Sequence, residues 1–364
     1  MLQLLLLLVV VVLLIAAAWA LTNRDTLRAW KQAAVIGTSL QPDSSITSRI
    51  VGRIAGDTLP IAPGASGPDR YPTTVVEPDG GGDHPAMVLL VPAAASESDR
   101  RDVVDVQDAI AAAGMAGWAV ELPSDAALLG QSGSDQRLAT TIRDIANQPR
   151  TSGDEVSVLA AGPAASLVLR EAARSGSAPI RAIVAVQPIP DLRVLLQRTL
   201  VDPSVDETLR DHAGSALALA ARDRVDPKAT IARAVLQQAA ESTDPLASLR
   251  AVPTGVLPTQ LAPLLDVVRA TDDAAFDEAW SRLPASLRGT LDSRSPAPVA
   301  PQVDARVLVV VDTTAPSVTT TGIDEFERRL PDARLVRVDA RSVTSVDTGE
   351  LLDVSAWWLR RAGA

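Results

Sequence analysis

Few side chains in this sequence can take up a proton or attack a substrate near neutral pH. The 364 residues include two histidines, His84 and His212, and no cysteine. Histidine is the side chain best suited to general acid–base work near pH 7, so a mechanism that needs it can be built in very few ways. The absence of cysteine excludes disulfides, zinc–thiolate sites, iron–sulfur clusters and a thiol nucleophile. No spacing of acidic residues supports a divalent metal, and we predict neither a metal nor a cofactor.

The charge and composition of the chain exclude some classes of binding partner. The chain carries 34 basic and 44 acidic side chains, a net charge of −10, and its pI is near 4.8. A nucleic-acid partner requires a basic face, so we expect none. Aromatic residues make up 2% of the chain, which argues against a stacking platform for sugars or bases. Apolar residues make up 47%, enough for a packed core.

The elements that must position any site alternate along the chain. Strands are predicted near residues 73–77, 87–91, 117–121, 156–160, 180–186, 306–311 and 334–338, with helices between most of them. These strands are too uniformly apolar to have a solvent-exposed face. Such strands are typical of a parallel sheet that helices cover on both sides. The fold class is therefore α/β, a doubly wound and mostly parallel sheet. Residues 192–287 interrupt the alternation with an alanine- and leucine-rich helical stretch, interpreted as an inserted cap.

Four sequence segments resemble the α/β-hydrolase family. Residues 84–92 (HPAMVLLVP) resemble its strand before the oxyanion loop, and residues 156–165 (VSVLAAGPAA) resemble its nucleophile elbow. Residues 182–188 (AIVAVQP) resemble the following strand, and residues 305–317 (ARVLVVVDTTAPS) the strand and loop that deliver the acid. The resemblance covers about residues 70–364. It implies a sharp turn that lifts a serine hydroxyl above the sheet, next to a histidine oriented by a carboxylate.

The positions that this resemblance assigns to catalysis lack the required side chains. Gly162 stands where the nucleophile belongs, and Pro163 removes a backbone N–H that the family uses in its oxyanion hole. Ala315 stands at the acid position, with Asp312 three residues earlier. The last loop, residues 339–345, contains no histidine. The resemblance thus implies a degenerate elbow and no catalytic triad.

Three functions compete. The leading hypothesis is a non-catalytic protein that binds a small apolar ligand or a protein partner. A divergent serine hydrolase of the esterase or lipase type, acting on ester bonds near a membrane, would need Ser96 or Ser166 together with His212. A structural subunit of a membrane assembly is the third. The expected cleft is lined by six residues: Pro92, Ala93, Gly162, Pro163, Asp312 and His212.

The N-terminus predicts a membrane anchor. Residues 4–21 are apolar without a break, which is close to the length of helix that crosses a bilayer. A cleaved signal peptide is the competing interpretation, but no basic residue precedes the apolar run. The lipid bilayer is thus an expected partner, and the protein a single-pass membrane protein. Arg24, Arg28 and Lys31 follow the span, so the positive-inside rule favours a cytoplasmic domain, although large domains also translocate and the side stays open.

The predicted organisation has four parts. Residues 1–22 form the anchor, and residues 23–69 a juxtamembrane connector. Residues 70–191 and 301–364 form the α/β-hydrolase-like core, and residues 192–300 the helical cap inserted into it.

Overall fold

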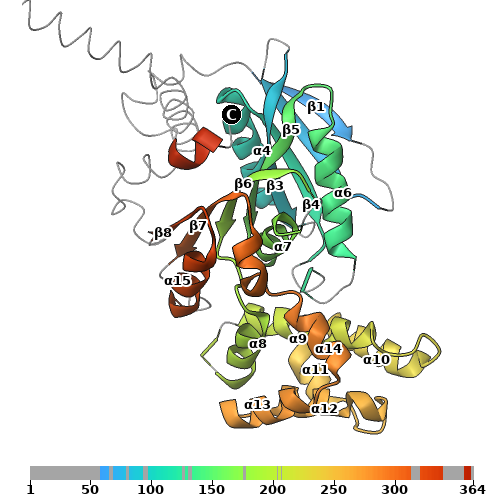
Figure 1. Cartoon of the computed structure of the whole chain (residues 1–364). Coiled ribbons are helices and arrows are strands. Elements are labelled where there is room, and N and C mark those ends of the chain that lie inside the picture. Colours follow the sequence, from blue (N-terminus) through green and yellow to red (C-terminus); the bar gives the residue numbers. More distant parts are fainter. Residues whose placement is uncertain are drawn as a thin grey trace, which may run out of the picture.

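The structure, a computed structural model, describes one mixed sheet with helices on both faces. A further group of helices lies beyond one end of the strands (Figure 1). The described residues are 58–64, 69–78, 82–92, 97–124, 128–129, 133–174, 178–202, 204–205, 207–312, 320–338 and 356–361.

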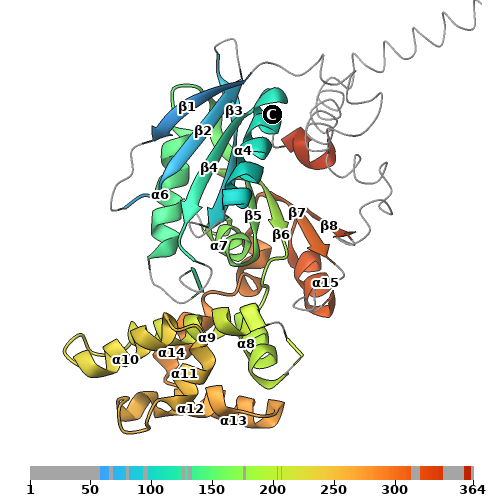
Figure 2. The same cartoon turned by 180° about the vertical axis from the view of Figure 1, so that it is seen from behind.

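Eight described strands pair in the order β1-β2-β4-β3-β5-β6-β7-β8 (Figures 1 and 2). β2 is antiparallel to both of its neighbours, β1 and β4, and all the pairs from β4 to β8 are parallel. The sequence prediction of a mostly parallel sheet is therefore confirmed. The strand bounds are β1 Thr58–Gly64, β2 Thr73–Pro78, β3 His84–Pro92, β4 Ala116–Leu122, β5 Thr151–Ala161, β6 Ile180–Val186, β7 Arg306–Asp312 and β8 Ala333–Val338.

The central strands bury both faces because successive side chains point to opposite sides of the sheet. In β3, Val88 and Leu90 lie in one apolar core, while Met87 and Leu89 lie in another. The first core is completed by α6 (Ser134–Ala146), α7 (Gly162–Ala172) and α15 (Thr320–Arg329). The second is covered by α4 (Glu97–Ala112) and by a short helix formed by residues 356–361. Two-sided burial explains the uniformly apolar strands of the sequence.

The C-terminal helix is attached to the sheet by two tryptophans. Trp358 is 3% exposed, and its indole N–H donates to the carbonyl oxygen of Ile183 in β6 at 2.9 Å. The ring of Trp357 lies 4.7 Å from the guanidinium carbons of both Arg306 and Arg334, so two cations contact one indole. Both adjacent tryptophans therefore belong to the domain's own core. The sequence predicts an amphipathic C-terminal helix over about residues 349–361, and its residues 349–355 lie outside the described ranges.

The edge strand β1 was not predicted from the sequence. Residues 58–64 fall in the predicted juxtamembrane connector (residues 23–69), for which no strand was expected, yet Thr58–Gly64 pairs with β2. Proline cannot donate to a strand ladder, but an edge strand has one side with no ladder to complete. β1 carries Pro60 and Pro63 at the edge of the sheet, where this is tolerated.

A helical insertion joins β6 to β7. It has a separate apolar core, built largely of leucine and alanine, with Phe276 and Trp280 stacked at 5.5 Å between ring centroids. Figure 1 shows these helices gathered beyond the end of the sheet where β6 leads out. The helices are α8 Leu192–Val201, α9 Glu207–Arg222, α10 Thr230–Ala240, α11 Pro245–Ala251, η1 Thr259–Leu261, α12 Ala262–Arg269, α13 Asp273–Arg282 and α14 Ala285–Asp292; the 3-10 helix η2, Ala297–Gln302, leads back to β7.

None of the helices in these described ranges is long and apolar enough to cross a bilayer. The predicted anchor, residues 4–21, lies outside the described residues, as does most of the predicted connector.

Candidate functional site

The turn between β5 and α7 has the backbone geometry that the sequence predicts for an elbow. β5 ends at Ala161, which is extended at φ −122° and ψ 152°, and α7 begins directly at Gly162. Gly162 has φ +53°, a left-handed conformation that is costly for most other residues. A Cβ built at Gly162 would meet no atom within 4 Å, so the corner faces open space. The chain thus keeps a sharp, left-handed corner and places no side chain on it.

A second left-handed residue lies at the end of the neighbouring strand. Gln187 follows β6 at φ +46°, and its backbone N–H donates to the carbonyl oxygen of Val310 at 2.7 Å. Gln187 is the one non-glycine residue with positive φ among those described. Because Ala161 pairs with Val186, the two corners lie side by side at the carboxyl edge of the sheet. Ligands of open α/β sheets bind outside this edge, which makes it the candidate site.

Ser166 connects the two corners. Its hydroxyl accepts the backbone N–H of Ile189 at 2.8 Å and donates to the carbonyl oxygen of Ile189 at 3.0 Å. The residue is 1% exposed. This hydroxyl is therefore buried and engaged with the main chain that leads from β6 into the insertion. Its contacts are those of a structural group.

The other predicted cleft residues fall in different parts of the fold. Pro92 and Asp312 end β3 and β7, at the same edge as Gly162 and Pro163, although nothing is described of their side chains. Ala93, Ala315 and Ser96 lie outside the described residues. His212 lies on α9, which packs against α10 and α11 inside the insertion. His84 begins β3, at the opposite end of that strand from Pro92.

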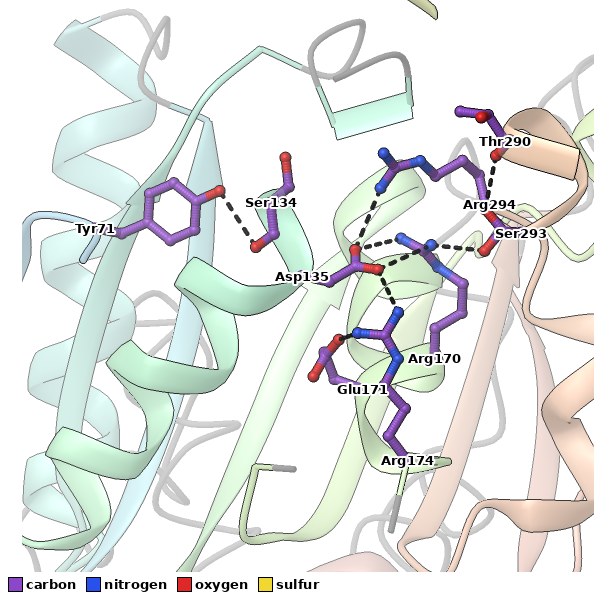
Figure 3. A network of polar contacts seen from close by, with 9 residues as sticks. All are labelled: Tyr71, Ser134, Asp135, Arg170, Glu171, Arg174, Thr290, Ser293 and Arg294. Carbon is purple, nitrogen blue, oxygen red and sulfur yellow. Dashed lines mark hydrogen bonds and ion pairs between the residues drawn. The ribbon is translucent and has the colours of Figure 1, made fainter. Parts of the chain in front are cut away.

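A buried ionic cluster, which the sequence analysis missed, holds the insertion to the helices beside the corner (Figure 3). Asp135, in the first turn of α6, accepts from Arg170 in the last turn of α7 at 2.9 Å and from Arg174, just after that helix, at 2.8 Å. Arg294, which follows α14, lies 3.4 Å from the same carboxylate. Arg170 also donates to the carbonyl oxygen of Ser293 at 2.8 Å. Three guanidinium groups from two parts of the fold thus share one carboxylate.

Burial shifts the pKa of two members of this cluster. Arg170 is 5% exposed, and burial lowers its pKa to about 10, so it stays charged near neutral pH. Glu171 is 1% exposed, and burial raises its pKa to about 7, although Arg174 contacts it at 2.5 Å and opposes the shift. The signal in the sequence is three charged residues, Arg170 and Glu171 at the end of an otherwise apolar helix and Arg174 just after it.

The raised pKa of Glu171 predicts a pH-dependent stability. The folded protein holds a proton on Glu171 up to about pH 7, whereas the unfolded chain loses it near 4.5, so between these values the folded state binds more protons. This contribution to the free energy of unfolding is complete below about pH 4.5 and is lost as the pH rises through 7. We expect Glu171→Gln to flatten this fall in urea unfolding measured across that range. Glu325→Gln, at an exposed site on α15, is the control, and an equal flattening there would contradict the assignment.

This chain resembles known proteins in its structure but not in its sequence. No family model matches the chain, and no curated protein matches it in sequence. An acylaminoacyl peptidase of Pyrococcus horikoshii matches at TM-score 0.47 and 8% identity over 88% of this chain, which spans 44% of that protein's length. The esterase Pf2001 of Pyrococcus furiosus matches at TM-score 0.42 and 12% identity, over 86% of this chain and 93% of that one. A dienelactone hydrolase of Anabaena variabilis matches at TM-score 0.41 and 14% identity, over 84% of this chain and 99% of that one.

The described part of the chain carries the features that the sequence resemblance implied. It has a mostly parallel sheet covered on both faces, a strand–corner–helix unit whose corner residue is left-handed, and helices inserted after the next strand. The fold is that of the α/β-hydrolases, in a divergent form.

Proposed function

We propose that this protein is anchored in a membrane and uses an α/β-hydrolase scaffold for binding instead of catalysis. The observation that carries the proposal is the left-handed corner at Gly162. Such a corner presents a nucleophile in a working hydrolase. Here it bears a hydrogen atom, and Pro163, the next residue, has no N–H to donate to an oxyanion. The chain keeps the left-handed backbone of the corner, which glycine adopts without strain, but not the side chain that such a corner would present.

The corner suits an apolar ligand better than a charged one. Its residues, from Ala160 through Ala164, are small and carry no polar side chain, and open space faces Gly162. The proposed occupant is therefore a small apolar molecule at the carboxyl edge of the sheet. The alternative occupant is a protein partner that docks on the helical insertion. Size exclusion of solubilised native membranes would then detect the protein in a larger complex.

A fluorophosphonate probe tests the absence of catalysis directly. This reagent labels serines that an adjacent base activates, so we expect no labelling of the full-length chain and no turnover of p-nitrophenyl esters. A serine hydrolase treated in parallel confirms that the probe is active. Stoichiometric labelling of one serine, abolished when that serine is replaced by alanine, would overturn the proposal in favour of the divergent hydrolase. The buried, engaged hydroxyl of Ser166 supports the expected result.

The proposed anchor is tested by membrane fractionation. An uncleaved helix over residues 4–21 keeps the chain in the membrane pellet after extraction with alkaline carbonate, because a spanning helix is not held by surface charge. Deletion of residues 1–22 should move the protein to the supernatant. A full-length chain that is released by carbonate would contradict the anchor.

A further inference from the structure

A groove of about 420 Å³ lies in the helical insertion, among α8, α13 and α14. No residue of the β5–α7 corner lines it. Its floor is formed by Trp280, which is 5% exposed and fixed by its stacking on Phe276. The volume is in the range of small-molecule sites. The groove is thus separate from the candidate site at the β5–α7 corner.

The groove is lined by two charged side chains of opposite sign, a half-buried Arg288 and an exposed Asp292, that pair with no described residue. Arg193 and Asp277, which also line it, pair with each other at 2.8 Å. By contrast, no hydrogen bond or ion pair within the described ranges engages the side chain of Arg288 or Asp292, and the Nε of Arg288 is buried without an acceptor. Both lie on α14, one helical turn apart, so their Cβ atoms are about 6 Å from each other.

The positions of Arg288 and Asp292 do not stabilise α14. Asp292 is the last residue of α14, where the helix dipole disfavours a carboxylate, and Arg288 lies on its N-terminal side, the weaker order for a helical ion pair. A cation bound beside Asp292 would offset the unfavourable interaction between its carboxylate and the helix dipole.

The groove is also kept open by a residue that is unfavourable in a helix. Gly289 lies inside α14, where glycine costs about 1 kcal/mol relative to alanine. A Cβ at Gly289 would meet no atom within 4 Å, so no packing contact requires the glycine. Ala285, one turn earlier, also lines the groove with a small side chain. Two small residues on α14 therefore leave room above the indole.

We propose that this groove binds a small zwitterion of the amino-acid type. The carboxylate of the ligand pairs with the guanidinium of Arg288, its ammonium pairs with the carboxylate of Asp292, and its apolar side chain lies on Trp280. Arg193 and Asp277 are already paired and form the rim of the groove. The inference does not depend on the proposed function, because the two sites share no residue.

The probe is L-leucine, titrated calorimetrically into the full-length chain beside two analogues that each lack one charge. N-acetyl-L-leucine has no ammonium and L-leucinamide has no carboxylate, and we expect each to bind about tenfold or more weakly than L-leucine, as for loss of one charge-assisted bond. Equal binding of all three would overturn the assignment of a zwitterion, and the absence of L-leucine binding would overturn the site.

Three variants locate the binding. Gly289→Leu places a bulky side chain at the groove on a Cβ that meets no atom within 4 Å, and it should abolish L-leucine binding while the protein stays folded. Arg288→Gln should weaken L-leucine by about tenfold but leave L-leucinamide unchanged, because the amide never used the guanidinium. Arg282→Gln, on the exposed side of α13, is the matched control and should bind as the wild type does. Undiminished binding to Gly289→Leu, with its fold verified by circular dichroism, would exclude the groove.

Discussion

Asp135→Asn is expected to lower the free energy of unfolding by about 3–5 kcal/mol, the usual cost of leaving buried charges without their partner. The reason is the convergence of three guanidinium groups on this carboxylate. The side chains of Arg170 and Arg294 are each 6% exposed, so water cannot replace the lost charge. Urea unfolding followed by circular dichroism measures the change.

Two further variants separate the charge from the substitution itself. Asp266→Asn breaks an exposed pair with Arg282 at 3.4 Å and should cost less than about 1 kcal/mol. Arg170→Met leaves Asp135 with Arg174 and Arg294, so its cost should fall below that of Asp135→Asn. If Asp135→Asn is no more destabilising than Asp266→Asn, the cluster does not stabilise the fold.

Trp358→Ala should be comparably destabilising, by about 3–5 kcal/mol, as expected for removing a buried aromatic ring. The indole fills the core between the sheet and the C-terminal helix, and its N–H donates to the carbonyl oxygen of Ile183. The same unfolding assay measures the loss, and a protease that cuts near the C-terminus should act faster on the variant.

The matched variant is Trp358→Phe, which keeps most of the ring and removes the N–H. Its cost should be near that of one lost hydrogen bond, about 0.5–1.5 kcal/mol, and smaller than that of Trp358→Ala, because Ile183 is also paired in the sheet. Equal effects of the two variants would show that ring burial is not the main contribution.

The alternation of apolar strands and helices was enough to predict the fold, because burial on both faces leaves a clear pattern in the sequence. Val88 and Leu90 face one core, and Met87 and Leu89 the other, so the whole strand is apolar. β1 escaped prediction because its prolines are acceptable only at a sheet edge, and the sequence does not reveal which strand is the edge. The corner at Gly162 was predicted because a glycine between small residues fits a left-handed turn.

The ionic cluster could not be predicted, because its members are distant in sequence. Asp135 and Arg294 are 159 positions apart, and an acidic residue in a first helical turn has a sufficient local explanation. The charged end of α7 was the one available clue. The groove on α14 was missed for a similar reason, since the opposite charges of Arg288 and Asp292 look like an ordinary helical pair until the structure places both in the lining of one groove.

The two connections of the helical insertion run next to each other. The backbone N–H of Ala297 donates to the carbonyl oxygen of Pro190 at 3.1 Å, and the backbone N–H of Leu192 donates to the hydroxyl of Ser295 at 2.9 Å. Because the entry and exit of the insertion are this close, a short loop could bridge them, and the insertion has a hydrophobic core of its own. The insertion is therefore a module that evolution or a designer can lengthen, exchange or remove while the order of the eight strands stays unchanged.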